Sequence, residues 1–299
     1  MTEWIDSITG TPEGARVASG LALSAAFLHA LFGALQKGRH DPWISRAAID
    51  LSYGAMALPV ALFLLPWPEP ALWPVLLGTT VIHIAYKLAQ AMTYDRGAYT
   101  VVYPVIRGTG PLFTVMAAGL VFAEHYNPVQ WAGVLLLVGA IFGLAAVNWH
   151  AAPDARRALS QALGLALLTG GFVALYTTYD AWGIRQARNP LVFLVWFFVL
   201  DSWFMPLLQW RRLAGLGRAD WPALAGRGVM GALVAFASFG SIMLATRIAD
   251  VGRAAVLRET STVFAALVGW LVLGEKVGML RSLLMALIAA GAIIVEMAG

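Results

Sequence analysis

The sequence contains no cysteine among its 299 residues. Disulfides, thiolate nucleophiles, zinc sites with thiolate ligands and cysteine-bound iron–sulfur clusters are therefore excluded. Charged residues are also scarce: they form 12% of the chain, against about 25% in soluble domains. Hydrophobic residues form 60%, against about 45–50% in soluble domains. Both departures indicate a protein that lies within a lipid bilayer.

Sequence motifs for catalysis are absent as well. The chain has no Gly-x-Ser-x-Gly nucleophile, no His-Glu-x-x-His zinc motif and no carboxylate cluster spaced for a metal, so we predict no catalytic residue, metal or cofactor. A phosphate-binding loop is also missing, which excludes a self-contained ATP-driven pump. The formal net charge of +4 is better explained by membrane topology than by nucleic-acid binding.

Ten apolar segments are each long enough to cross the bilayer, which requires about 20 residues. Breaks that contain proline, such as Asp41-Pro42, Asn127-Pro128 and Asn189-Pro190, separate several of them. The sequence therefore predicts an all-α integral membrane protein with ten transmembrane helices. We place these helices at residues 15–36, 43–65, 71–94, 97–122, 128–149, 158–184, 190–211, 221–246, 250–273 and 278–297.

The distribution of lysine and arginine predicts the orientation, because basic residues concentrate on the cytoplasmic side. An external N-terminus places twelve of them in cytoplasmic connections and five outside, so we expect both termini outside. The cytoplasmic set is Lys37, Arg39, Arg46, Arg96, Arg156, Arg157, Arg211, Arg212, Arg218, Arg227, Lys276 and Arg281, and the external set is Arg16, Arg185, Arg188, Arg247 and Arg253.

The two halves of the chain resemble one another. A shift of 151 positions places Arg107 on Arg258 and Glu124 on Glu275 without a gap. Because five is an odd number, two consecutive five-helix units must cross the membrane in opposite senses. The sequence thus predicts two inverted repeats, residues 15–149 and 155–297, in one transmembrane domain around a central cavity.

A glutamate closes the fourth helix of each unit, in Ala123-Glu124-His125 and in Leu273-Gly274-Glu275. Together with the duplicated five-helix unit, this pattern resembles the drug/metabolite transporter superfamily, in its EamA-type ten-helix branch. Ala123 departs from the pattern, because glycine is usual there. The resemblance implies export of amino acids, aromatic ones included, or similar small metabolites by alternating access. It also implies a bacterial inner membrane, with both termini in the periplasm.

The third predicted helix carries a polar stripe, although each ionisable side chain in a membrane costs about 2.5–3.5 kcal/mol. Its members recur at spacings of three or four and share one face of the helix. This face either lines a cavity, where Lys87 attracts a carboxylate, or forms polar contacts with other helices. We favour the cavity because the stripe is long. It consists of Thr79, His83, Tyr86, Lys87, Gln90 and Tyr94.

Four further residues are predicted to bind substrate. Tyr99 and Tyr103 lie one turn apart on the fourth helix, and Tyr176 and Asp180 have the same spacing on the sixth. Tyrosine rings can stack on an organic solute or surround a cation. Together with His83, Tyr86, Lys87 and Gln90, they form the predicted binding site.

Arg107 and Arg258 lie about ten residues into their helices, and hence near the middle of the membrane. They either form ion pairs that hold or switch the two halves, or one of them binds substrate. We favour ion pairs because both repeats contain the arginine. The acidic candidates are Asp50, Asp180, Asp201 and Glu259.

Other functions remain open at this point. Proton antiport of other metabolites or hydrophobic cationic drugs is the first alternative, and an uncoupled facilitator also fits. A more distant alternative is an intramembrane enzyme that modifies lipids. The expected partners are a small-molecule substrate and the bilayer, and a monomer is favoured over a homodimer.

Overall fold

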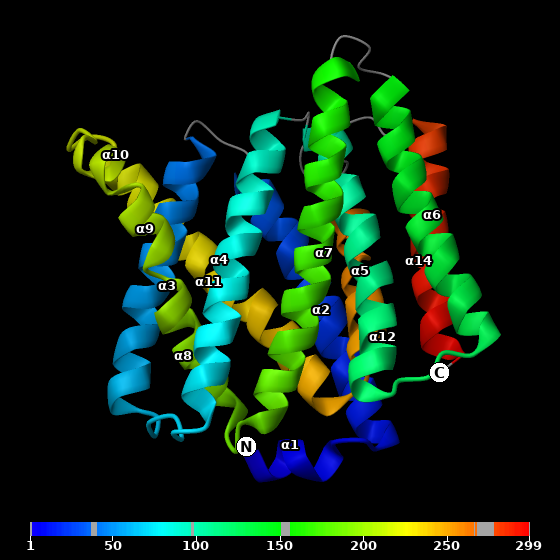
Figure 1. Cartoon of the computed structure of the whole chain (residues 1–299), viewed down its shortest axis with the longest axis horizontal. Coiled ribbons are helices and arrows are strands. Elements are labelled where there is room, and N and C mark those ends of the chain that lie inside the picture. Colours follow the sequence, from blue (N-terminus) through cyan, green and yellow to red (C-terminus); the bar gives the residue numbers. More distant parts are fainter. Residues whose placement is uncertain are drawn as a thin grey trace.

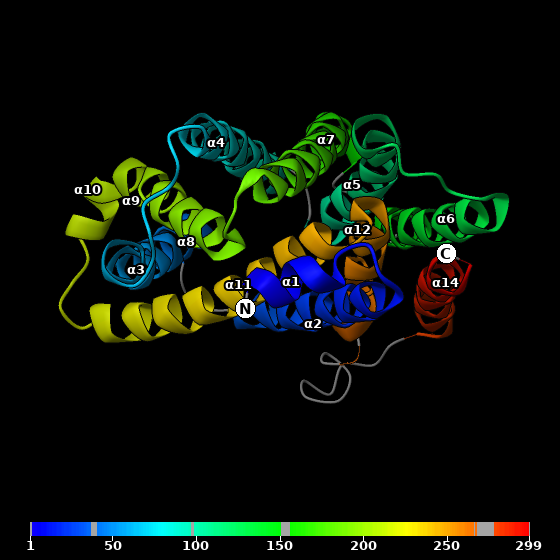
Figure 2. The ribbon, with the colours of Figure 1, turned by 90° about the horizontal axis from the view of Figure 1, so that it is seen from below.

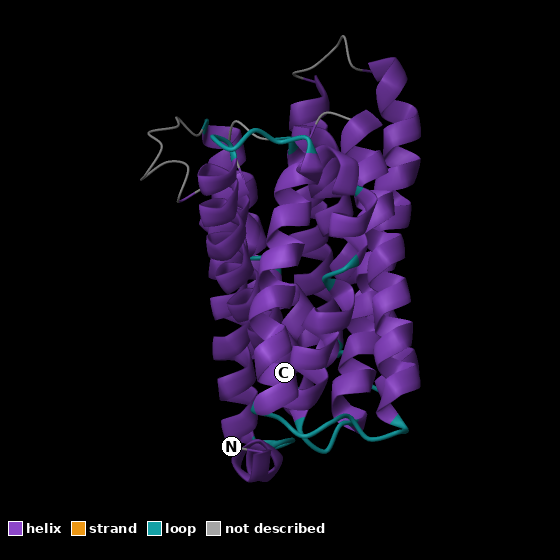
Figure 3. Ribbon diagram, turned by 90° about the vertical axis from the view of Figure 1, so that its left-hand side faces the viewer, coloured by secondary structure: helices purple, strands orange, loops and turns teal. Residues whose placement is uncertain are grey.

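The computed structural model describes residues 2–36, 41–96, 99–150, 156–265, 267 and 278–298. Within these ranges the regular structure is helical and no strand occurs (Figure 3). Nine helices in the described ranges are long and apolar enough to cross a membrane. The helices are α1 (Thr2–Ile8), α2 (Pro12–Gln36), α3 (Pro42–Phe63), α4 (Leu72–Arg96), α5 (Tyr99–Phe122), α6 (Pro128–His150), α7 (Arg156–Gln186), α8 (Pro190–Asp201), α9 (Phe204–Leu208), α10 (Trp210–Ala214), α11 (Trp221–Ile248), α12 (Val251–Arg258) and α14 (Met279–Met297).

Nine of the predicted spans correspond to these nine candidates. The span predicted at 250–273 is described in part. Its first eight described helical residues form α12, a turn follows at Glu259 and Thr260, and helical backbone resumes over 261–265. Residues 266 and 268–277, which include Gly274 and Glu275, lie outside the described ranges.

Two further features differ from the sequence prediction. The short helix α1 lies across one end of the bundle, where Ile5 and Ile8 are buried (Figure 2). The span predicted as one helix at 190–211 ends its first helix at Asp201 and continues as α9 and α10. Gly54 of α3 accommodates this break, because a Cβ atom there would lie 2.3 Å from the Ser202 hydroxyl oxygen.

The long helices stand side by side, and both chain termini lie at the same end of the bundle (Figure 1). We call this the terminus end. Helix α11 packs on α2 and α3, α4 packs on α7, and α5 packs on both α6 and α7. The pair α6 and α14 lies at one side of the elongated bundle and α10 at the other (Figure 2).

Glycines allow the helices to approach closely. A Cβ atom on Gly133 of α6 would lie 2.8 Å from the Gly291 carbonyl oxygen of α14. Likewise, a Cβ atom on Gly170 of α7 would lie 2.6 Å from the Thr109 Cβ of α5. Small residues serve this purpose in membrane bundles, where packing replaces the hydrophobic effect as the force between helices.

The outer surface of the bundle is apolar and its interior holds many polar groups. Phe63, Leu120 and Met279 are more than four-fifths exposed, whereas Asp50 and Glu259 are at most 1% exposed. This arrangement is the reverse of the one that water favours, and it is expected where lipid surrounds the helices.

The first half of the chain is tied to the second half by Glu124 at the terminus end. Its carboxylate accepts hydrogen bonds from the backbone N–H groups of Val251 (2.7 Å) and Gly252 (3.0 Å), at the start of α12. Burial raises the pKa of Glu124, and these two bonds oppose that rise. Ala123, which precedes it, has φ +54°, in the left-handed region that favours glycine. The left-handed conformation of residue 123 thus explains why glycine is usual at this position.

Candidate functional site

Two helices of the second half are interrupted, and a cation from the first half meets each interruption. Lys87 of α4 donates to the Asp201 carbonyl oxygen (3.1 Å), where α8 ends. Arg107 of α5 lies 3.4 Å from the Arg258 carbonyl oxygen, where α12 ends, and donates to the Ser261 hydroxyl at 2.8 Å. Irregular backbone within a membrane is tolerated where other groups satisfy the freed carbonyls.

Lys87 also forms the centre of a buried ion network. Its ammonium nitrogen lies 2.6 Å from Asp50 and 2.7 Å from Asp201. The other Asp50 oxygen binds Arg46 Nε at 2.7 Å, and the Tyr53 hydroxyl donates to Asp201. Two cations therefore balance two carboxylates, and the net charge of the network is zero.

A second buried pair joins Arg107 to Glu259, with 2.7 Å between Nε and Oε2. Arg107 is 7% exposed and Glu259 1% exposed. The Arg107 guanidinium also lies 6.0 Å from the centre of the Tyr103 ring, a cation–π distance. The turn at Glu259 after α12 places its carboxylate against α5, so this pair connects the two halves in the interior of the bundle.

A cavity of about 110 Å³ lies beside the Lys87 network, at mid-height of α4 and α11. Most of its wall is aromatic. The His83 ring lies 4.6 Å from the Tyr176 ring and 4.7 Å from the Phe197 ring, centre to centre. Phe197 in turn stacks on Phe239 at 5.2 Å. The lining residues are His29, Arg46, Tyr53, His83, Tyr86, Tyr176, Phe197, Phe198, Asp201, Ala235, Ser238 and Phe239.

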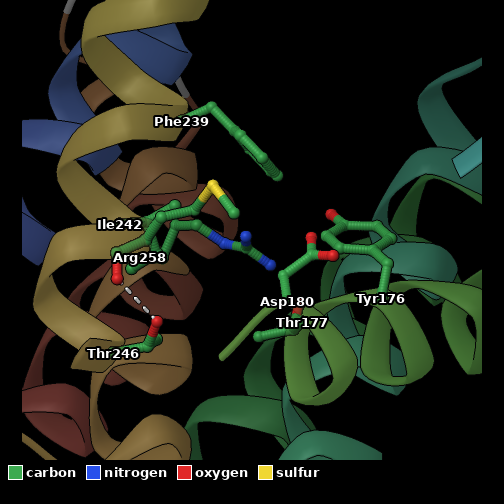
Figure 4. A pocket seen from close by; sticks show the side chains of 8 residues that line it. Tyr176, Thr177, Asp180, Phe239, Ile242, Thr246 and Arg258 are labelled. Carbon is green, nitrogen blue, oxygen red and sulfur yellow. Dashed lines mark hydrogen bonds between the residues drawn. The ribbon is translucent and has the colours of Figure 1, made fainter. Parts of the chain in front are cut away.

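A smaller pocket of about 10 Å³ adjoins this cavity, since Tyr176 and Phe239 line both. Asp180 of α7 and Arg258 of α12 lie on its opposite walls, and their charged groups are turned toward one another (Figure 4). One Asp180 oxygen lies 2.7 Å from His83 Nε2. Thr177, Ile242, Met243 and Thr246 complete the lining.

The contacts between the halves are dense at the terminus end. Glu124 binds the start of α12 there, and the Gly10 N–H donates to the Ile248 carbonyl at 3.2 Å. Arg247 binds Asp6 of α1 at 2.9 Å and also donates to three carbonyl groups at the end of α7. At the opposite end, Arg212 pairs with Asp41 on the exposed surface. These contacts fix α1, α7, α11 and α12 to one another at the terminus end.

Four of the predicted substrate-binding residues lie at these two spaces. His83, Tyr86 and Tyr176 line the larger cavity, and Tyr176 and Asp180 line the smaller pocket. Helices α4 and α7 bring them together, because these two helices pack along their length. Their contact with a solute stays a prediction.

Of the other four predicted residues, Lys87, Gln90 and Tyr103 are not among the residues that line either space. The Lys87 ammonium is engaged by Asp50 and Asp201, so a solute carboxylate would have to displace one of them. Gln90 donates to the Tyr86 hydroxyl at 2.6 Å and so acts through that side chain. Tyr103 lies beside Arg107, and Tyr99 begins α5 with a side chain outside the described part.

Sequence reasoning missed several lining residues. Arg46 and Tyr53 share the face of α3 that carries Asp50, at spacings of four and three, so a search for polar stripes could have found them. Phe197, Phe198 and Phe239 carry no such signal, because aromatic residues are common in any apolar helix.

Comparisons with known proteins agree with this architecture. Residues 160–297, which include most of α7 and all of α8 to α12 and α14, match the EamA-like transporter family. The second half of the chain is EamA-like. A Sinorhizobium protein called "Uncharacterized transporter in cobO 3'region" is 29% identical over 133 residues, or 43% of this chain and 92% of that protein.

One solved crystal structure has the same fold over nearly the whole chain, including the half outside the EamA-like match. Its TM-score is 0.73 at 16% sequence identity, and the superposition covers 96% of this chain and 99% of the other. With the apolar spans, the EamA-like match makes the chain a multi-pass membrane protein.

Proposed function

We propose that the protein is a secondary transporter that exports amino acids, aromatic ones included, or similar small organic metabolites. The aromatic-walled cavity carries this proposal, because it lies amid membrane-spanning helices and is lined by the interrupted helix α8, and the pocket that adjoins it is lined by Arg258 at the end of the interrupted helix α12. Transporters commonly bind substrate at such discontinuous helices near the bilayer midplane. The EamA-like second half and the relative described as a transporter support the same class. No enzymatic activity is proposed.

Alternating access of two inverted five-helix repeats, with ten membrane passages in all, is the proposed mechanism. Reciprocal packing supports it: α4 of the first half packs on α7, and α11 of the second half packs on α2. We further propose that the terminus end faces the periplasm of a bacterial inner membrane and forms the closed outer gate. We also propose that the protein resembles the bacterial amino-acid exporter YddG in function. The protein is proposed to act as a monomer.

The proposed solute contacts are His83, Tyr86, Tyr176 and Asp180, with Lys87, Gln90, Tyr99 and Tyr103 around them. Asp50, Asp201, Arg107, Arg258 and Glu259 are proposed to hold or switch the two halves. In support, Lys87 and Arg107 each reach from the first half to an interrupted helix of the second. A change in the relative position of the halves would have to break both contacts.

The cavity must widen to admit such a solute. With about 110 Å³, the cavity is smaller than most sites that hold a small molecule. Sites for small molecules usually measure about 300–1,000 Å³. The structure therefore corresponds to a contracted state, and solute entry requires α4 and α7 to move relative to α8 and α11.

Counterflow in liposomes tests the proposal. Purified protein is reconstituted with internal phenylalanine, and uptake of labelled phenylalanine is followed alongside nucleosides, sugars and hydrophobic cations. Tyr176→Ala should abolish exchange because it removes the shared wall of both spaces. Tyr179→Ala, one turn away on α7 and packed on Gly78 and Trp182, is the matched control and should retain exchange. If only hydrophobic cations were exchanged, the substrate class would be cationic drugs and not amino acids. Turnover of an added lipid without solute movement would favour an intramembrane enzyme.

Proton antiport is the second candidate mechanism, because buried carboxylates contact His83 and Lys87. Counterflow with and without a pH gradient separates it from uncoupled exchange. Equal rates would exclude obligatory proton coupling.

A further inference from the structure

Three buried polar atoms around the smaller pocket have no hydrogen-bond partner within the described residues. They are Asp180 Oδ1, Thr177 Oγ1 and Arg258 Nε. Buried polar atoms are paired in the great majority of cases, so three exceptions around one space require an explanation. A bound ligand that supplies both a donor and an acceptor would satisfy them.

Arg258 is the most unusual of the three. It is 5% exposed, and within the described ranges its guanidinium has neither an ion pair nor a hydrogen bond. Its counterpart Arg107, by contrast, pairs with Glu259 and Ser261. A buried charge without a partner is costly in protein and in membrane alike. An anionic group is therefore the expected occupant beside Arg258.

Asp180, on the wall opposite Arg258, favours a positively charged group of the ligand (Figure 4). Asp180 is 3% exposed, His83 contacts its Oδ2 atom and the Thr79 hydroxyl lies nearby, but Oδ1 makes no hydrogen bond of good geometry with a described residue and can accept from a further donor. Asp180 does not neutralise Arg258 directly, since the two lie on opposite sides of the pocket and form no ion pair (Figure 4). The Lys87 network and the Arg107–Glu259 pair are each neutral without them.

We infer that Asp180 and Arg258 bind the two charged groups of a zwitterionic α-amino acid, its ammonium at Asp180 and its carboxylate at Arg258. The pocket of about 10 Å³ holds at most one water-sized group, so it must widen together with the larger cavity before both charged groups fit between Asp180 and Arg258. Tyr176 and Phe239 line both spaces, so the solute's side chain would extend between them into the aromatic cavity. This inference rests on the proposed function and gives Arg258, a predicted ion-pair residue, a role in substrate binding.

Three compounds with the same ring test the inference: L-phenylalanine, 2-phenylethylamine without the carboxylate, and 3-phenylpropanoate without the ammonium. Binding to the purified full-length protein is measured by tryptophan fluorescence, since amines cross bilayers unaided. The wild type should bind phenylalanine at least about tenfold more tightly than either analogue, the usual effect of one charge-assisted hydrogen bond.

The variants should separate the two charges. Asp180→Asn should weaken phenylalanine and phenylethylamine by about 10- to 100-fold and leave phenylpropanoate unchanged. Arg258→Gln should weaken phenylalanine and phenylpropanoate and leave phenylethylamine unchanged. Arg253→Gln, which breaks a pair with Glu296 elsewhere in the bundle, is the control and should bind all three as the wild type does.

Equal affinities of the wild type for the three compounds would overturn the inference, as would variants that weaken all three alike. The wild-type comparison decides the matter if Arg258→Gln does not fold. If phenylalanine counterflow were observed but the three compounds bound equally well, the inference about Asp180 and Arg258 would fail and the proposed transport function would remain supported. Absence of counterflow with every amino acid would refute the proposed substrate class itself.

Discussion

Removal of the Lys87 charge tests whether electrostatic balance holds the site together. In Lys87→Met the apolar stem remains and the ammonium is lost, so both of its ion pairs disappear. Asp50 keeps Arg46 at 2.7 Å, but Asp201 keeps only the uncharged Tyr53 hydroxyl and is 2% exposed. Breaking a buried pair on one side costs about 3–5 kcal/mol, so we expect that loss in the free energy of unfolding.

A compensating change should recover part of this loss. Asp201→Asn in the Lys87→Met background removes the stranded carboxylate and returns the network to zero net charge. We expect the double variant to be about 1–3 kcal/mol more stable than Lys87→Met, since a neutral buried amide costs less than a charge. Asp201→Asn alone leaves Lys87 paired with Asp50 and should cost less than Lys87→Met.

The unfolding free energy can be measured by titration with SDS in mixed micelles, followed by the fluorescence of the chain's 12 tryptophans. Asp41→Asn is the control: it weakens an exposed pair with Arg212 and keeps an N-cap side chain, so the expected cost is under about 1 kcal/mol. If the two single effects simply add in the double variant, charge balance does not stabilise the network and the reasoning fails.

Three further predictions concern other contacts. Ala123→Gly should stabilise the protein by about 1 kcal/mol in the same titration, because residue 123 has φ +54°; a loss of stability would contradict this reason for the usual glycine. Gly170→Val should destabilise by about 1–3 kcal/mol or more, because its side chain would overlap Thr109 of α5, whereas Gly164→Val, with open space around it, should cost about 1 kcal/mol or less. Burial raises the pKa of Glu124 above 4.5, so its contribution to stability should be present below that pH and be lost as pH rises through the higher folded value; pH titration of the unfolding free energy should show this step in the wild type and not in Glu124→Gln.

The charged residues show which features of this protein could be predicted from one helix and which depend on contacts between helices. The polar stripe that contains His83, Tyr86 and Lys87 was evident from spacing alone, since residues three or four apart share a helix face. The partners of Lys87 were not evident, because Asp50 and Asp201 lie 37 and 114 positions away. Several buried acids were equally plausible candidates before the packing of α3, α4 and α8 was known.

The sequence by itself determined that the chain is helical and lies in a membrane, because apolar length and composition are properties of each segment alone. It also indicated the faces that carry polar groups. Only the tertiary structure decided where α8 and α12 end, since cations from the first half, Lys87 and Arg107, meet the carbonyl groups freed there. It likewise left Arg258 without a partner in the described part of the chain while Arg107 acquired one, although the two arginines align in the sequence. Which charge is satisfied depends on how the helices pack, and a pattern along one helix does not contain that information.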